Sequence, residues 1–175
     1  DALPILSTDL IIEDKEQTEN FKEDKKGYIE FNNVSFKYPN AEEDVLSDIS
    51  FVAKPGETTA FIGSTGSGKS TLINLIPRFY DVTEGSIKVD GVDVRNVSQH
   101  DLREKIGYVP QKGILFSGTI DSNLRYGREE ATDVEIVRAA EIAQAMEFIS
   151  SKPERFETEI SQGGTNEIGR ASCRE

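Results

Sequence analysis

Cysteine, methionine, histidine and tryptophan are almost missing from this chain, which has 175 residues with one Cys, one Met, one His and no Trp. The lone Cys173 excludes a framework of disulfide bonds and suits a reducing compartment. No run of about 18 apolar residues occurs, so the sequence predicts no membrane-spanning helix of its own. The first residues also lack the basic and apolar segments of a signal peptide. These absences predict a soluble, cytosolic chain.

Basic residues are fewer than acidic ones: the chain has 20 Lys and Arg and 32 Asp and Glu, so its net charge is -12. Binding to the phosphate backbone of a nucleic acid needs a basic face, so we expect no nucleic-acid partner. Hydrophobic residues make up 36% of the chain and charged residues 30%, as in globular domains. The length allows one domain with a core of its own.

The first part of the chain changes from charged to β-rich. Residues 13–26 are mostly charged and lack apolar periodicity, which predicts a solvated linker. Residues 28–54 contain alternating runs such as YIEFNNVSFKY, which predict antiparallel strands. The run TTAFIG, residues 58–63, predicts a strand that leads directly into a glycine-rich loop, and residues 69–76 predict a helix.

Strands and helices alternate in the remainder of the chain. GSIKVDGVDV predicts a hairpin that turns at Asp90-Gly91. A short helix over 101–104 and a strand over KIGYVP, residues 105–110, are expected next, followed by a helix that begins near Thr119. A last helix is expected over 132–149, where a threonine followed three residues later by a glutamate forms a capping box. This order predicts an α/β core with an added antiparallel piece at its start.

Residues 63–70, GSTGSGKS, fit the pattern G-x-x-x-x-G-K-[S/T]. Glycines let such a loop curl until its backbone N–H groups point inward, and the N-terminus of the following helix favours a phosphate. Lys69 can reach the β- and γ-phosphates, and the Ser70 hydroxyl can ligate Mg²⁺. A flexible glycine-serine turn is the other interpretation. The strand expected before the loop and the helix expected after it favour nucleotide binding.

Four segments, taken in order, resemble the nucleotide-binding domain of an ATP-binding-cassette (ABC) transporter: VSFKYP, GSTGSGKSTLINLIPRFYD, GSIKVDGVDV and IGYVPQKGILFSGTIDSNLRYG. The exporter type, in which this domain follows a membrane domain on the same polypeptide, is the most similar. The resemblance covers residues 28–166. It implies a P-loop NTPase (RecA-like) core, an N-terminal antiparallel β subdomain and the start of a helical subdomain, so that the domain is incomplete.

The resemblance also implies which residues bind MgATP. Tyr38 matches the aromatic residue that stacks on adenine, and Gln111 matches the glutamine between the core and the helical subdomain, where it can join the Mg²⁺ shell with Ser70. Lys69 is the one catalytic residue that this resemblance assigns. Phe116 matches the segment that faces the membrane domain, whereas His100 matches no functional position. The nucleotide-binding residues are expected to be Tyr38, Gly63, Ser64, Thr65, Gly66, Ser67, Gly68, Lys69, Ser70, Thr71 and Gln111.

The resemblance stops after Asn166, where the family's signature helix, the Walker B aspartate and the catalytic glutamate should follow. The chain instead ends with EIGRASCRE, which the start of a widely used sequencing-library adapter encodes. The reverse complement of that stretch encodes DALPI, residues 1–5. We therefore interpret residues 1–27 as adapter-derived residues and linker, 28–166 as a partial nucleotide-binding domain and 167–175 as a non-native tail.

As a function, the resemblance implies the ATP-binding part of an ABC transporter ATPase that exports a substrate from the cytoplasmic face of the cell membrane. Its partners would be a membrane domain and a second nucleotide-binding domain, as a homodimer or heterodimer. Without the catalytic glutamate, the chain is expected to bind MgATP without turnover. A soluble P-loop protein, such as a nucleotide kinase or small GTPase, is the alternative, although the Asn-Lys-x-Asp motif of GTPases is absent.

Overall fold

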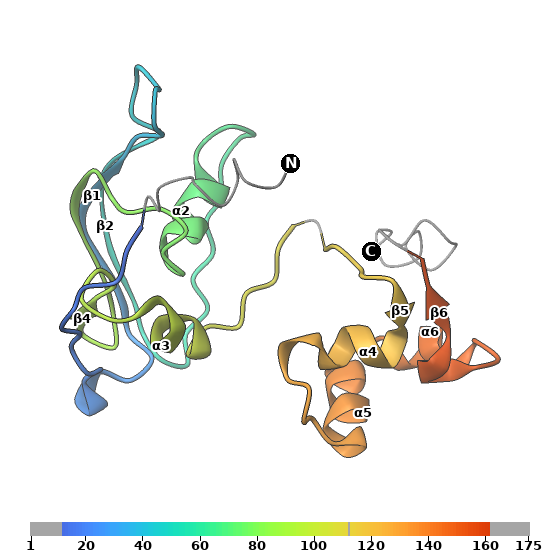
Figure 1. The fold of residues 1–175 in the computed structure, drawn as a ribbon. Helices are drawn as coiled ribbons and strands as arrows, with labels where there is room; N and C mark the ends of the chain where they lie inside the picture. The colour runs from blue at the N-terminus through green and yellow to red at the C-terminus, as the bar shows by residue number, and fades with distance from the viewer. Residues whose placement is uncertain (1–11, 112, 162–175) are drawn as a thin grey trace, which may run out of the picture. The chain divides into compact units, whose positions relative to one another are not determined.

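The computed structural model describes residues 12–111 and 113–161, and the chain divides into two compact units, residues 1–108 and 109–175 (Figure 1). Residues 1–5 and 167–175, which we interpret as adapter-derived, lie outside the described residues. In the first unit the elements are η1 (Glu23–Lys25), β1 (Ile29–Phe36), β2 (Leu46–Ala53), α2 (Lys69–Leu75), β3 (Glu84–Val89), β4 (Val92–Asp93) and α3 (Gln99–Glu104).

The four strands of the first unit form one antiparallel sheet in the order β2-β1-β3-β4. Phe31 on the central strand β1 pairs with Phe51 on β2 and with Ile87 on β3. The rings of Phe31 and Phe51 stack with their centroids 4.5 Å apart. The antiparallel strands predicted within residues 28–54 are therefore confirmed.

A two-residue turn joins β3 to β4, because Val89 pairs directly with Val92. Asp90 and Gly91 both have positive φ, 49° and 74°, which is the backbone of the tight turn that suits a twisted hairpin. The predicted hairpin is thus confirmed. At the other end of β3, Gly85 has a φ of 77° and lies so close to β1 that a Cβ atom would be 2.2 Å from the Asn33 carbonyl oxygen.

The helices of the first unit bury apolar side chains in the same core as the sheet. Leu72 and Leu75 of α2 and Leu102 of α3 are buried with Phe31, Val34 and Ile87. The helix predicted over 69–76 is confirmed, with Ile76 as its C-cap. The predicted short helix is also present and begins two residues earlier, at Gln99, because Ser98 caps it by accepting the Asp101 N–H.

Two predicted strands are wrong within the described part of the chain: neither 58–63 nor 105–110 forms a strand. A strand exists only where a neighbouring strand exchanges hydrogen bonds with it, and no described residue pairs with either segment. One apolar side chain in each segment remains almost fully uncovered, with Ile62 97% and Val109 93% exposed, whereas Phe61 and Ile106 pack partly buried against the core. The apolar pattern of both segments favours strands, but a local pattern carries no information on the partner strand.

The second unit has a small core between a two-stranded sheet and short helices. Its elements are β5 (Gly118–Thr119), α4 (Ile120–Leu124), η2 (Arg125–Gly127), α5 (Asp133–Ile142), α6 (Met146–Ser150), η3 (Arg155–Glu157) and β6 (Glu159–Ile160). Strands β5 and β6 are antiparallel, and Ile120, Ala140, Ile149 and Ile160 are buried together. The predicted helix from Thr119 is confirmed as α4, which Thr119 caps.

The single helix predicted over 132–149 is two helices, α5 and α6. Its predicted capping box is present: the Thr132 side chain accepts a hydrogen bond from the Glu135 N–H, and the Glu135 side chain accepts one from the Thr132 N–H. The break follows from Gln144, whose φ is 55°. Its N–H donates to the Glu141 carbonyl, and the Ala145 N–H donates to the Ala140 carbonyl, which together form a Schellman motif. Glycine usually occupies this position at the end of a helix, so a glutamine there does not predict that the helix ends.

Candidate functional site

The glycine-rich loop between residues 63 and 68 folds back on itself. Gly66 and Gly68 have φ values of 84° and 82°, a backbone that other residues rarely adopt. A Cβ on Gly63 would lie 2.7 Å from the Ser67 Oγ, so the two ends of the loop meet. A Cβ on Gly68 would lie 2.8 Å from Leu46, where β2 begins. The glycines therefore allow both the curl of the loop and its close seat on the sheet.

Lys69, the first residue of α2, turns its side chain back into this loop. Its Nζ donates to the carbonyl oxygens of Gly63 and Ser64 at 2.8 and 2.6 Å, and to the Ser67 Oγ at 3.1 Å. Three loop oxygens thus hold one ammonium group in a defined place. The arrangement puts a positive charge within a loop of glycine and hydroxyl residues, which suits an anionic ligand.

The start of α2 adds further donors. The first N–H with a helical partner is that of Leu72, which donates to the Gly68 carbonyl at 2.9 Å. The N–H groups of Lys69, Ser70 and Thr71 have no acceptor within the described part of the chain, and no side chain caps this helix. Such N–H groups and the helix dipole attract phosphate. The exposed Ser70 hydroxyl at the same helix end has the oxygen chemistry that Mg²⁺ prefers.

The structure brings Tyr38 to the same helix. Its hydroxyl lies 3.0 Å from the Thr71 Oγ1. Its ring is half-buried and meets Phe36 and Tyr80 edge-to-face, with centroid distances of 4.8 and 5.2 Å. The contact to Thr71 fixes the distance between an aromatic ring and the loop. An aromatic ring fixed beside a loop that suits an anionic ligand has the chemistry to stack on a base.

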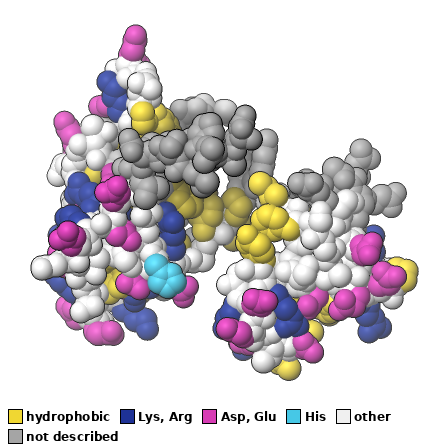
Figure 2. Space-filling model, viewed as in Figure 1, with side chains coloured by type: hydrophobic (Ala, Val, Ile, Leu, Met, Phe, Trp, Pro, Cys, Tyr) yellow, Lys and Arg dark blue, Asp and Glu magenta, His cyan; other side chains and the backbone are white. Residues whose placement is uncertain are grey.

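Gln111, the other predicted Mg²⁺ ligand, is exposed and belongs to the second unit. Its place in the site therefore stays a prediction. Tyr80 is a residue that the sequence did not indicate, although its ring supports that of Tyr38. No sequence spacing predicts the contact between positions 80 and 38, because only the folded chain brings these two rings together. His100 is exposed on α3, where Figure 2 shows a histidine at the surface.

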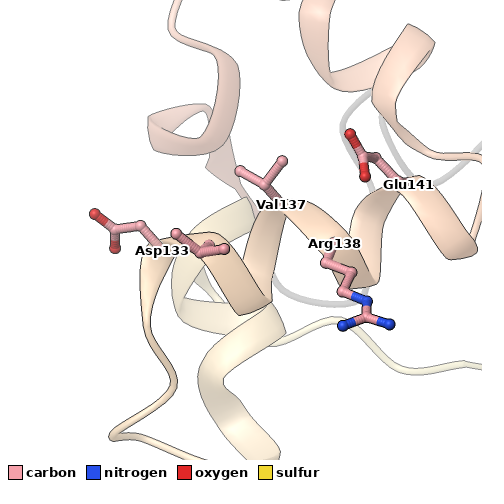
Figure 3. A pocket seen from close by; sticks show the side chains of 5 residues that line it. Asp133, Val137, Arg138 and Glu141 are labelled. Carbon is pink, nitrogen blue, oxygen red and sulfur yellow. The ribbon is translucent and has the colours of Figure 1, made fainter.

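The second unit has a shallow hollow of about 540 Å³ along α5, lined by Asp133, Val134, Val137, Arg138 and Glu141. Figure 3 shows that the charged groups of Asp133, Arg138 and Glu141 point in different directions. A binding site needs polar groups that converge. None of the nucleotide-binding residues expected from the sequence lines this hollow. The loop at residues 63–71, rather than this hollow, is the candidate site.

Two absences hold for the described residues. None of their helices is both long and apolar enough to cross a membrane. Within residues 12–111 and 113–161, no cluster of His, Cys, Asp and Glu could hold a metal ion by itself. A metal ion at this site would therefore depend on hydroxyl and amide oxygens together with phosphate oxygens, which is common for Mg²⁺.

Comparisons with known proteins agree with this geometry. The family described as ABC transporter matches residues 46–173. A "Putative multidrug export ATP-binding/permease protein" of Staphylococcus aureus (strain NCTC 8325 / PS 47) is 47% identical over 145 residues, which cover 83% of this chain and 25% of that protein. The similarly described YgaD of Bacillus subtilis (strain 168) is 46% identical over 144 residues, which cover 82% of this chain and 25% of YgaD.

A solved structure is also similar, that of a bacterial Atm1-family ABC exporter with ATP bound. Its TM-score is 0.85 at 34% sequence identity, over 93% of this chain and 28% of the exporter chain. The chain thus spans about a quarter of the length of the curated relatives that it matches. The family match covers more than half of the chain and includes the loop, Lys69 and α2. This protein belongs to the ABC transporter family.

Proposed function

We propose that this chain is the ATP-binding part of an exporter-type ABC transporter ATPase, and that it binds MgATP at the loop of residues 63–71. The observation that supports this most is the Lys69 ammonium, held by Gly63, Ser64 and Ser67 beside the free N–H groups of α2. Together they form a concentrated positive field suited to a polyphosphate.

Each residue of the site has a role that follows from its chemistry. The N–H groups of residues 69–71 and the Lys69 ammonium hold phosphate oxygens. Ser70 supplies a hydroxyl to Mg²⁺, and Gln111 supplies a second oxygen. Tyr38 supports the adenine base with its ring, while its bond to Thr71 keeps that ring at a fixed distance from the phosphates. Bound Mg²⁺ would neutralise phosphate charge.

The parent protein is a membrane exporter in this proposal. Both curated relatives are described as ATP-binding/permease proteins, in which the two functions share one polypeptide. The partners are then a membrane domain and a second nucleotide-binding domain, and the site works at the cytoplasmic face of the membrane. A soluble P-loop protein unrelated to transport is disfavoured by the family match.

Equilibrium binding of MgATP to the 175-residue chain tests this proposal. Replacing Lys69 with alanine removes charge-assisted hydrogen bonds of about 1.5–3 kcal/mol, so we expect affinity to fall about tenfold or more. Lys54→Ala, which removes an exposed lysine after β2, is the matched control and should leave affinity unchanged. MgGTP should compete with similar affinity, because ring stacking discriminates little between bases. Equal MgATP affinity in the Lys69 and Lys54 variants would refute the site.

A further inference from the structure

Residues 12–22, which we term the strap, lie along the first unit despite their charged composition. The Glu19 N–H donates to the Asn96 carbonyl at 2.7 Å, and the Lys22 N–H donates to the Asp90 carbonyl at 3.0 Å. The Asn96 side chain in turn donates to Glu19 at 2.6 Å. Backbone bonds of this kind fix the path of the chain. The strap therefore follows a defined path along the segment between β3 and α3.

Asp14 is the point where the strap meets two elements at once. Both of its carboxylate oxygens accept the Gln99 N–H at 3.1 Å, at the first residue of α3. The same carboxylate lies 3.5 Å from the Arg78 guanidinium, just after α2. One side chain thus connects the start of α3 with the end of α2.

Arg78 is an unusual partner because it is only 3% exposed. Its guanidinium donates to both oxygens of Asp81 at 2.8 and 3.2 Å, and to the Glu13 carbonyl of the strap at 3.2 Å. A buried charge is stable only while its partners remain in place. Its backbone is also in the left-handed region, with a φ of 55°, so the surroundings must hold it there. The strap therefore supplies some of the hydrogen-bond acceptors that stabilise the buried Arg78 guanidinium.

The end of α2 is held to the strap on one side and to α3 on the other. The Arg78 N–H donates to the Leu75 carbonyl in the last turn of α2, and Arg103 of α3 donates to the Pro77 carbonyl at 3.2 Å. The whole of α2 is seven residues, or about 10 Å. A short helix moves as one body, so a shift at Leu75 is carried to Lys69 at its other end.

We propose that Asp14 is a positioning residue for the phosphate loop. Through Arg78 it fixes the end of α2, and α2 in turn fixes Lys69 and the N–H groups that meet phosphate. This inference rests on the proposed function for its effect on nucleotide affinity. Docking of the strap and binding of MgATP are then coupled, and such coupling is reciprocal: each favours the other by the same factor. Tension on residues 12–22 would weaken nucleotide binding.

The test uses the full 175-residue chain and two measurements, the Kd of MgATP and amide hydrogen exchange. Asp14→Ala should raise the Kd about fivefold or more, the lower end of typical coupling. Asp14→Glu keeps a carboxylate and should restore most of the affinity. Glu16→Ala is the matched control, because Glu16 is an exposed acid of the same strap without a hydrogen bond or ion pair among the described residues. It should behave as the unchanged chain.

Hydrogen exchange separates positioning from a general loss of stability. In the unchanged chain, MgATP should slow exchange at the Glu19 and Lys22 amides by the same factor as that by which Asp14→Ala raises the Kd. In the Asp14→Ala variant, MgATP should not slow exchange at these amides. Equal Kd values for Asp14→Ala and Glu16→Ala, or no effect of MgATP on these amides, would overturn the inference.

If the unchanged chain binds no MgATP, the proposed function fails instead. Exchange at the Arg78 and Phe79 amides without nucleotide then decides: faster exchange in Asp14→Ala supports positioning of α2, and unchanged exchange rejects it.

Discussion

Tyr38 carries two separable contributions, its ring and its hydroxyl. The ring meets Phe36 and Tyr80, and the hydroxyl meets Thr71. Tyr38→Ala removes both and should weaken MgATP binding by about 1–3 kcal/mol, the range for base–aromatic stacking. Tyr38→Phe keeps the ring and should lose only a small part of this affinity. Titration with a fluorescent ATP analogue measures both. A phenylalanine variant as weak as the alanine variant would show that the hydroxyl, rather than the ring, holds the nucleotide.

Gly85 offers a test of stability at a single backbone position. A Cβ there would lie 2.2 Å from the Asn33 carbonyl oxygen, and its φ of 77° already disfavours other residues. We expect Gly85→Ala to lower the free energy of unfolding by about 2 kcal/mol or more. Gly56→Ala is a matched control, since Gly56 has the same φ and a Cβ there would meet no atom within 4 Å. Urea unfolding compares them, and equal losses would show that φ alone, without the steric clash, explains the cost.

Sequence predicts well that residues lie together when one short motif contains them. The glycines and Lys69 lie within eight consecutive residues, and the structure joins them as the pattern requires. Arg78 and Asp14 were not predicted, because they are 64 positions apart and only folding brings them together. Long-range pairs of this kind leave no local pattern.

The capping box of α5 makes stability dependent on pH. Hydrogen bonds from the Thr132 backbone and side chain, together with Arg128, lower the pKa of Glu135 to about 2 from 4.5. Between these values the unfolded chain binds the proton that the folded chain rejects, so stability is present above about pH 4.5 and is lost as the pH falls towards 2. The Glu135→Gln variant should lose less stability over this window. Urea unfolding followed at both pH values checks this, with Glu129→Gln, an exposed neighbour, as the control.

Thr132 supports the same box from the other side, because its hydroxyl accepts the Glu135 N–H. Thr132→Ala should lower the free energy of unfolding by about 1 kcal/mol, as for other N-caps. Thr132→Ser retains the hydroxyl and should recover most of it. Urea denaturation measures both variants, and an alanine variant as stable as the serine variant would contradict the cap.

Elements were predicted where local chemistry decides them. The hairpin at Asp90-Gly91 and the capping box at Thr132 depend on neighbours a few residues away. The strands expected over 58–63 and 105–110 failed because a strand needs a partner from elsewhere in the chain. The single helix predicted over 132–149 was wrong for another reason. The helix ends at Gln144, where the residue that usually marks such an end is glycine.

Turnover is a property of the whole molecule. Phosphoryl transfer to water needs held phosphates, a complete Mg²⁺ shell and an oriented water molecule. We propose residues 63–71 for the first need. The resemblance locates no general base in the 175 residues, and the loss of such a base typically costs about 10²–10⁴-fold in rate. We expect phosphate release by the unchanged chain to equal that of Lys69→Ala. Steady release above that control would show a catalytic group that the sequence comparison missed.

The uncovered side chains of Ile62 and Val109 affect how the isolated chain behaves in solution. Each belongs to an apolar segment without a strand partner among the described residues, and Ile114 is exposed as well. Unpaired backbone beside apolar side chains is a template for contact between copies. The net charge of -12 opposes such contact, but salt screens it. Raising the ionic strength should therefore promote self-association of this chain, so that affinities for nucleotide are best measured in dilute, low-salt solution.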